Sequence, residues 1–305
     1  MLNKIIRVTF CILFVLSIIM TYFSSTYQLE DSNTLPNVSL TNDTELLHIS
    51  GELFNKSSHE LYKHLYIRYQ GQATSKNFTD NAPKRLLNIS SNAFLTVTTR
   101  SLIKLFDNYE FDTYRTEVAT KEEDREENEF INNIMRSDVM LHVMQFLSAK
   151  HFFTNDLQIH KDILKEVWFH PYSRGKGINS SSGFEHVFVG EKNPRKGVIG
   201  LHNWIFFSLG ELSNKINYFG FSKNKEFADR AAVLEARFTY NGKRKRSTML
   251  IGTMPELEIA LYTLCFFTRP NRKCKISFDG FRFAVQTYVL RNGDKKYVAA
   301  AFPVI

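Results

Sequence analysis

The spacing of apolar residues changes near residue 165, and this change limits the fold more than any other feature of the chain. From about residue 45 to 165, apolar side chains recur three and four positions apart, which is the spacing of an amphipathic helix. The clearest stretches are Leu102–Phe106, Phe130–Met135 and Val139–Leu147. The pattern therefore predicts a helical N-terminal part in which each helix buries one face. The acidic stretch 121–129 is expected to be a solvated helix face, and no function is assigned to it.

The second half of the chain has the pattern of β-strands. Strands are predicted at Phe184–Val189, Leu234–Tyr240, Phe281–Leu290 and Lys296–Ile305, and turns at Gly242, Gly280 and Gly293. One strong helix is expected at 255–266, because Pro255 and Glu256 suit a first helical turn. The sequence thus predicts an α+β fold, with a helical part at about 45–165 and an antiparallel-sheet part at about 166–305.

The first 26 residues have the order of a targeting segment. Lys4 and Arg7 precede an apolar run at 8–23, and small polar residues follow it. The run is slightly shorter than the about 20 residues of a spanning helix, so a cleaved signal peptide and an uncleaved type II anchor both remain open. Either would make the protein secreted or a single-pass membrane protein with a luminal or extracellular body. Residues 27–44 are typical of a polar tether.

Two further features are typical of the secretory pathway. Glycosylation sequons occur at Asn37, Asn42, Asn55, Asn77, Asn88 and Asn179. Outside the apolar run only Cys265 and Cys274 remain, and an oxidising compartment would allow them to pair. The alternative is two separate buried thiols.

The charge of the chain favours a polyanionic partner. Its formal net charge is +8, which suits nucleic acid or an anionic membrane. The densest group of cations is the run Lys243-Arg-Lys-Arg246, which follows the turn-forming pair Asn241–Gly242. Four cations beside a turn suit phosphate contacts. A solvated hairpin tip or a protease processing site would have the same composition.

Two segments carry histidines suited to proton transfer. His186 lies within Ser182–Glu191 and His202 within Gly200–Trp204. Imidazole exchanges a proton near neutrality, so one ring could take the proton of a ribose 2′-OH while the other protonates the departing 5′-oxygen. A cation would then stabilise the charge on the phosphorane oxygens. Because the chain has nine histidines, a structural role is the alternative for each.

The acidic residues near these histidines leave several interpretations open. Glu185 and Glu191 could be metal ligands, orienting partners or ordinary surface carboxylates. The sequence holds no dense group of His, Cys, Asp and Glu typical of a zinc site. It also lacks the Gly-x-Ser-x-Gly element of a serine hydrolase.

Three blocks resemble the EndoU family of XendoU-like, poly(U)-specific endoribonucleases. These blocks are Ser182–Glu191, Leu201–Ile205 and Leu250–Phe266, in the family's order and spacing, and the resemblance extends over about 45–305. It implies an α+β enzyme, expected to be a monomer, that cuts single-stranded RNA preferentially at uridylates. The expected products carry 2′,3′-cyclic phosphate ends. Manganese, or calcium in its place, is the implied stimulating cation, and no metal ligands are assigned.

The resemblance also implies roles for individual residues. His202 is expected to be the base and His186 the acid, although the two could exchange roles. Lys245 is the expected catalytic lysine, and Lys243 is the alternative. Ser247 would contact the base, Glu185 and Glu191 would support activity, and Cys265 with Cys274 would form the pair found in relatives.

The C-terminal segment departs from the family pattern. Where many relatives have Thr-Ala-Tyr, this chain has Ala300-Ala-Phe302. Phe302 keeps a ring for stacking on a base but loses the hydroxyl, and Ala300 removes a polar contact. We therefore expect cleavage to survive with a weaker preference for uridine. The competing hypothesis is a secreted or membrane-tethered protein that binds RNA or phospholipid with weak or lost catalysis.

Overall fold

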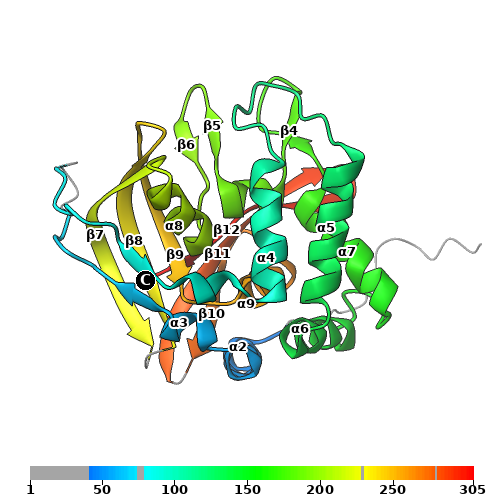
Figure 1. The fold of residues 1–305 in the computed structure, drawn as a ribbon. Coiled ribbons are helices and arrows are strands. Elements are labelled where there is room, and N and C mark those ends of the chain that lie inside the picture. The colour runs from blue at the N-terminus through cyan, green and yellow to red at the C-terminus, as the bar shows by residue number, and fades with distance from the viewer. Residues whose placement is uncertain (1–40, 74–78, 228–229, 279) are drawn as a thin grey trace, which may run out of the picture. The chain divides into compact units, whose positions relative to one another are not determined.

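The structure is a computed structural model that describes residues 41–73, 79–227, 230–278 and 280–305. The residues from Thr41 onward form one compact unit that combines helices with antiparallel sheets (Figure 1). The predicted α+β class is therefore confirmed. Residues 1–26, most of the expected tether, Asn37 and Asn77 lie outside the described residues. Among the described helices, none is long and apolar enough to cross a membrane.

The helices of the N-terminal part, except α3 (Glu60–Lys63), begin at residues whose side chains cap them. The others are α2 (Asp43–Lys56), α4 (Val97–Lys104), α5 (Lys121–Ile134), α6 (Asp138–Ala149) and α7 (Leu157–Phe169). Asn42 and Thr120 each form a capping box, with Glu45 and Glu123 respectively. Each pair satisfies backbone N–H groups that a helix start leaves without partners, and this fixes where the helix begins. Helix α2 starts inside the segment expected as a tether.

Two three-stranded antiparallel sheets dominate the rest of the chain. One contains β7 (Ile216–Phe227), β8 (Ala231–Tyr240) and β9 (Lys243–Ile251), and the other contains β10 (Lys273–Phe278), β11 (Phe281–Asn292) and β12 (Lys295–Val304). Short pairs join β1 (Leu65–Ile67) to β2 (Leu87–Ile89), β3 (Tyr172–Ser173) to β4 (Asn179–Ser181), and β5 (Glu191–Asn193) to β6 (Gly197–Ile199). Strands β9 and β12 approach each other, which brings the two sheets together at one edge.

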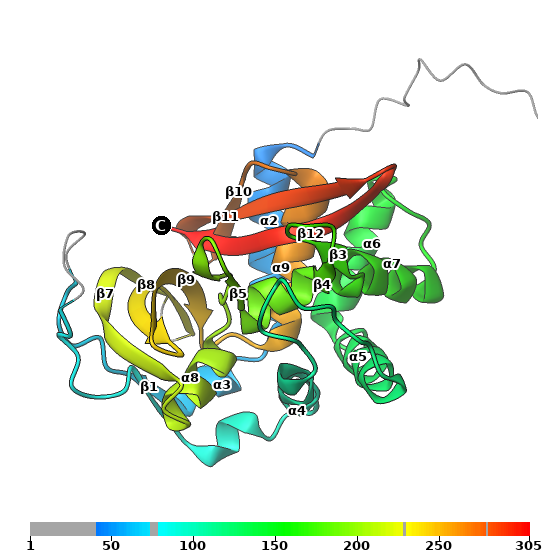
Figure 2. The same cartoon turned by 90° about the horizontal axis from the view of Figure 1, so that it is seen from above.

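Helix α9 (Pro255–Thr268) lies in the centre of the core. Its residues are buried almost without exception, and it packs against α2, α6 and the strands β11 and β12 (Figure 2). The helix is mostly apolar around its circumference, although it also buries Glu256 and Glu258, and helices and a sheet together cover it. Cys265 near its end pairs with Cys274 of β10, with Cα atoms 5.5 Å apart.

The predictions of individual elements had mixed outcomes. Strands β8, β11 and β12 and helix α9 confirm the predicted elements at 234–240, 281–290, 296–305 and 255–266. The strand predicted at Phe184–Val189 is wrong, because Glu185–Val189 forms a π-helix, η3, in which every residue is buried. The antiparallel-sheet part also contains a second helix, α8 (Trp204–Leu212), and the helical part contains the pair β1–β2. The described sequon residues, Asn42, Asn55, Asn88 and Asn179, are all exposed.

Candidate active site

The backbone holds the two predicted histidines side by side. His186 lies in η3, and His202 comes two residues before α8. The amide of Leu201 donates to the carbonyl of His186 at 2.9 Å, and the amide of His202 donates to the carbonyl of Val187 at 2.7 Å. The imidazole rings therefore lie 6.3 Å apart, centroid to centroid. Both residues are only 7% exposed. The two rings thus share one site instead of lying in separate pockets.

A buried carboxylate orients His186. Oε1 of Glu191, at the start of β5, lies 2.6 Å from Nδ1 of His186. Because a carboxylate only accepts hydrogen bonds, the Nδ1–H of His186 donates to it, and Nε2 carries the lone pair of the neutral ring. Burial raises the pKa of Glu191 to about 7, although Arg174 and Ser181 oppose the rise. Of the interpretations left open by the sequence, the geometry thus favours an orienting partner.

Arg174 binds the same oxygen of Glu191 as His186 does, and it was not found by sequence reasoning. Its guanidinium forms an ion pair with Glu191, and its Nη2 donates to the hydroxyl of Tyr172 and to the carbonyl of Ala299, both at 2.7 Å. It thereby connects the carboxylate behind His186 to strand β12. Arg174 follows β3 in a loop that matches no motif, so no sequence signal pointed to it.

His202 is oriented by strand β9. Its Nδ1 lies 3.0 Å from the carbonyl of Thr248 and 2.8 Å from Oγ of Ser247. The hydroxyl of Ser247 donates to the carbonyl of Leu201 at 2.5 Å, so its oxygen accepts from Nδ1–H. The neutral ring again keeps its lone pair on Nε2. Ser247, expected to contact the RNA base, is buried here and engaged with His202.

Lys245 is the cation that acts on both imidazoles. It lies on β9 opposite Phe238, on the same face of the strand as Ser247. Its charge lowers the pKa of His186 and of His202, in each case after burial, which is the largest cause. For His186, Arg174 is the second cause after burial and Lys245 is the third. Burial lowers the pKa of Lys245 itself to about 8, with Arg246 as the second cause.

Lys243, the alternative candidate for the catalytic lysine, is more exposed than Lys245. Lys243 is exposed at the start of β9, beside the hairpin turn. The whole run Lys243–Arg246 is paired with β8 by backbone register. A segment held in a sheet is a poor protease substrate, so the processing-site interpretation of this run is not supported. Of the two candidates, Lys245 is the one whose charge reaches the imidazoles.

An aromatic ring covers His202 on the side of β12. The ring of Phe302 is stacked on the imidazole at 4.7 Å between centroids, with an angle of 16° between the planes. Tyr288 of β11 follows at 6.3 Å from Phe302, tilted by 31°. Ala300, the other departure from the family pattern, lies directly across from Tyr288 in the β11–β12 register. The aromatic group expected at residue 302 is thus in contact with the ring of His202.

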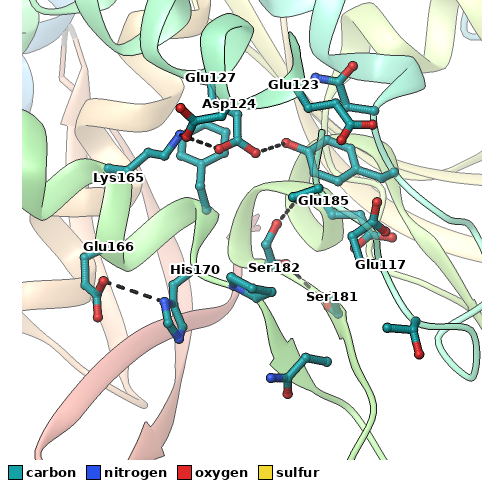
Figure 3. A pocket seen from close by; sticks show the side chains of 17 residues that line it. Glu117, Glu123, Asp124, Glu127, Lys165, Glu166, His170, Ser181, Ser182 and Glu185 are labelled. Carbon is teal, nitrogen blue, oxygen red and sulfur yellow. Dashed lines mark hydrogen bonds and ion pairs between the residues drawn. The ribbon is translucent and has the colours of Figure 1, made fainter. Parts of the chain in front are cut away.

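Glu185 lines a cavity whose wall includes neither His186 nor His202. The cavity has a volume of about 340 Å³, and its wall includes the carboxylates of Glu117, Glu123, Asp124, Glu127, Glu166 and Glu185 (Figure 3). Burial, followed by the charge of Glu191, raises the pKa of Glu185 well above its ordinary value. Three of these residues belong to the acidic stretch 121–129, to which the sequence assigned no function. Within the described ranges, no three His, Cys, Asp or Glu side chains already converge to hold a metal ion.

Comparison with known proteins agrees with this geometry. Residues 45–303 match the family model described as Endoribonuclease XendoU. Uridylate-specific endoribonuclease EndoU of Drosophila melanogaster is 33% identical, covering 85% of this chain and 82% of the relative. Uridylate-specific endoribonuclease D of Xenopus laevis is 34% identical, covering 79% and 81%, and uridylate-specific endoribonuclease B of Danio rerio is 32% identical, covering 86% and 96%.

A solved structure shows the same fold. The structure of XendoU, described as a splicing-independent snoRNA-processing endoribonuclease, matches with a TM-score of 0.71 and 31% identity, covering 85% of this chain and 96% of its own. The family match spans most of the described residues, and it includes η3, α8 and both three-stranded sheets. The chain therefore belongs to the XendoU family of endoribonucleases.

Proposed function

We propose that the protein cleaves single-stranded RNA preferentially at uridylates by internal transesterification, leaving 2′,3′-cyclic phosphate ends. His202 removes the proton from the ribose 2′-OH, His186 protonates the departing 5′-oxygen, and the Lys245 ammonium stabilises the phosphorane oxygens. The observation that carries the proposal is the pair of imidazoles 6.3 Å apart, each with Nδ1 engaged by a fixed acceptor. This arrangement leaves Nε2 of both rings for proton transfer.

The acceptors on Nδ1 support this division of roles. Glu191 is a carboxylate, and its negative charge stabilises an imidazolium at His186, which is the form that an acid needs. The acceptors at His202 are a carbonyl and a hydroxyl, both neutral, and they favour the neutral ring that a base needs. An RNA phosphate between the rings would raise the pKa of both from their depressed resting values.

Binding without catalysis is not favoured. A pure RNA- or phospholipid-binding protein has no need to fix the tautomers of two buried imidazoles or to lower the pKa of a lysine beside them. Burying such groups costs free energy, and side chains with strongly shifted pKa values are concentrated at catalytic sites.

The test compares histidine variants on one short RNA with a single uridine. His186→Ala and His202→Ala are each expected to lower kcat by about 10²–10⁴-fold with folding intact. His48→Ala is the matched control, because this histidine is exposed on α2. Mass spectrometry of the products should show cyclic phosphate ends. Full activity of purified His202→Ala would refute the mechanism.

The cellular location is part of the same proposal. The protein is secreted or is a type II membrane protein with a luminal or extracellular catalytic part. Exposed sequon residues such as Asn55, Asn88 and Asn179 support glycosylation there. The Cα atoms of Cys265 and Cys274 lie 5.5 Å apart, which supports a disulfide formed in an oxidising compartment. The presence of the protein in culture medium or in membranes tests its location. Glycosidase treatment tests glycosylation, and non-reducing peptide mapping tests the disulfide.

We propose in addition that manganese or calcium stimulates the enzyme from the acidic cavity. The donors fit chemically, because hard cations prefer carboxylate oxygens. Among the described residues, Oε1 of Glu185 is buried without a hydrogen-bond partner, which is an unfavourable state that a cation would relieve. Glu185 and Glu117 would hold the ion, and Asp124 and Glu127 of α5 would join them by giving up their ion pairs with Lys165 in the same cavity. When bound, the cation supplies charge neutralisation next to η3.

A further inference from the structure

Tyr288 is an exposed aromatic residue at the edge of the active site. Its relative exposure is 48%, whereas the tyrosines of the core, such as Tyr218 and Tyr262, are almost fully buried. A tyrosine on a strand normally buries its ring against cross-strand neighbours. Here the residue directly opposite is Ala300, whose small side chain cannot cover the ring. The sheet thus leaves an aromatic face open to solvent next to Phe302.

The three rings of His202, Phe302 and Tyr288 form a row that leads outward from the chemistry. Phe302 stacks on His202, and Tyr288 contacts Phe302 from the next strand. Phe302 and Tyr288 lie on the same face of the β11–β12 pair, because Phe302 is paired with Gln286, two residues before Tyr288. Tyr288 is therefore one ring further from the catalytic base than Phe302, and it is more exposed.

Cations lie on the neighbouring strand. Strand β9, which carries Lys243 and Lys245 on one face, approaches β12 at this edge. An aromatic surface beside a line of cations is the combination that binds single-stranded nucleic acid, because bases stack on rings while phosphates contact ammonium groups. A phospholipid surface could use both the cations and an exposed ring, but this row of rings begins at His202 inside the active site, where an RNA substrate must bind. The charge pattern and the contact with the active site thus favour a nucleobase as the occupant.

We infer that Tyr288 forms a stacking subsite for a nucleobase that flanks the cleaved uridylate. This inference rests on the proposed function and deepens it, because it makes the enzyme sensitive to the base next to the cut. Stacking needs the ring but not the hydroxyl, so Tyr288→Phe should bind RNA like the natural protein. Tyr288→Ala should lose the contact.

The experiment is a double-mutant cycle that combines removal of the Tyr288 ring with removal of a flanking base of the RNA. The substrates are trinucleotides with a central uridine and adenine on both sides, and matching trinucleotides with an abasic residue at the 5′ flank, the 3′ flank or both. Tyr288→Ala is expected to lower kcat/KM on the fully based substrate by about 5- to 150-fold. The loss should vanish when one particular flank is abasic, and that flank identifies the stacked base. Tyr66→Ala, which removes another exposed aromatic residue, is the matched control.

Binding separates this inference from the catalytic proposal. The same four substrates with 2′-deoxyuridine at the centre cannot be cleaved. Differences among their Kd values therefore report the stacking of a flanking base without any contribution from cleavage. The natural protein could bind the deoxyuridine substrates tightly and yet fail to cleave the matching substrates that carry the 2′-hydroxyl group. That result would contradict the catalytic proposal only. An equal loss for Tyr288→Ala on all four substrates, or no loss on any, would overturn the stacking subsite.

Discussion

A Cβ atom on residue 200 would lie 1.9 Å from the main-chain oxygen of His186, so only glycine allows the two histidine segments to meet. Gly200 also has φ +71°, a conformation that favours glycine. The chain passes so close because the next two amides, those of Leu201 and His202, bind the carbonyls of His186 and Val187. The distance between the imidazoles is thus set by a backbone contact between η3 and residues 200–202.

Gly200→Ala should therefore separate the rings. Displacing a catalytic group by about 1 Å can cost about 10²-fold in rate, and we expect a loss of kcat of that order. Gly242→Ala is the matched control, because Gly242 has φ +72° with open space around the added methyl group. Both variants suffer the same backbone strain, but only Gly200→Ala should lose activity at a temperature where both are folded. Equal kcat values in the two variants would contradict this account.

Arg174 should act as a positioning residue for His186. In Arg174→Gln the carboxylate of Glu191 loses its cation, its pKa rises further above its ordinary value, and the protonated form becomes a poorer acceptor for Nδ1–H. Carboxylates that orient metal-bound histidines typically contribute about 10–100-fold, and we expect a similar loss in kcat with little change in KM.

A double-mutant cycle distinguishes positioning from a general loss of stability. Arg174→Gln should cost much less activity in a Glu191→Gln background, because the pair that it supports is already absent. Arg174→Lys should restore part of the rate by restoring the charge. Additive losses in kcat would show that Arg174 acts independently of Glu191.

Much of this arrangement could be predicted from local sequence patterns. Strands β11 and β12 and helix α9 have long patterns with clear ends, and the histidine blocks are long enough to identify the family. Segment 184–189 was misassigned, because a short apolar run does not distinguish a strand from a buried helical turn. Arg174 and the acidic cavity depend on contacts between segments far apart in the chain. Glu117, Asp124 and Glu185 line one cavity only because α5 packs beside the loop before η3, and no local pattern records that.

The acidic cavity predicts a stabilising effect of divalent cations. Manganese or calcium should raise the Tm of the natural protein, by roughly 2–4 °C for each kcal/mol of binding free energy. Glu185→Gln should weaken this shift, because it removes the carboxyl group that a bound cation would hold in its ionised form, while keeping the shape of the side chain. Glu226→Gln, on β7 and outside the cavity, is the control. Scanning calorimetry with and without cation, after chelation, makes the comparison. An unchanged shift in Glu185→Gln would locate the cation elsewhere.

The lowered pKa of Lys245 predicts the pH above which activity falls. Its pKa is lowered to about 8, so the ammonium is present below that pH and is lost as the pH rises through it. Because the phosphorane needs the charge, kcat/KM should fall as the pH rises above about 8. A guanidinium stays charged throughout this range, so Lys245→Arg should be slower at neutral pH yet show no fall near 8. Lys243→Arg should leave the profile unchanged, since Lys243 is exposed and further along β9. A fall near pH 8 that persists in Lys245→Arg would assign the titration to another group and would remove the support that this pKa gives to Lys245 as the catalytic cation.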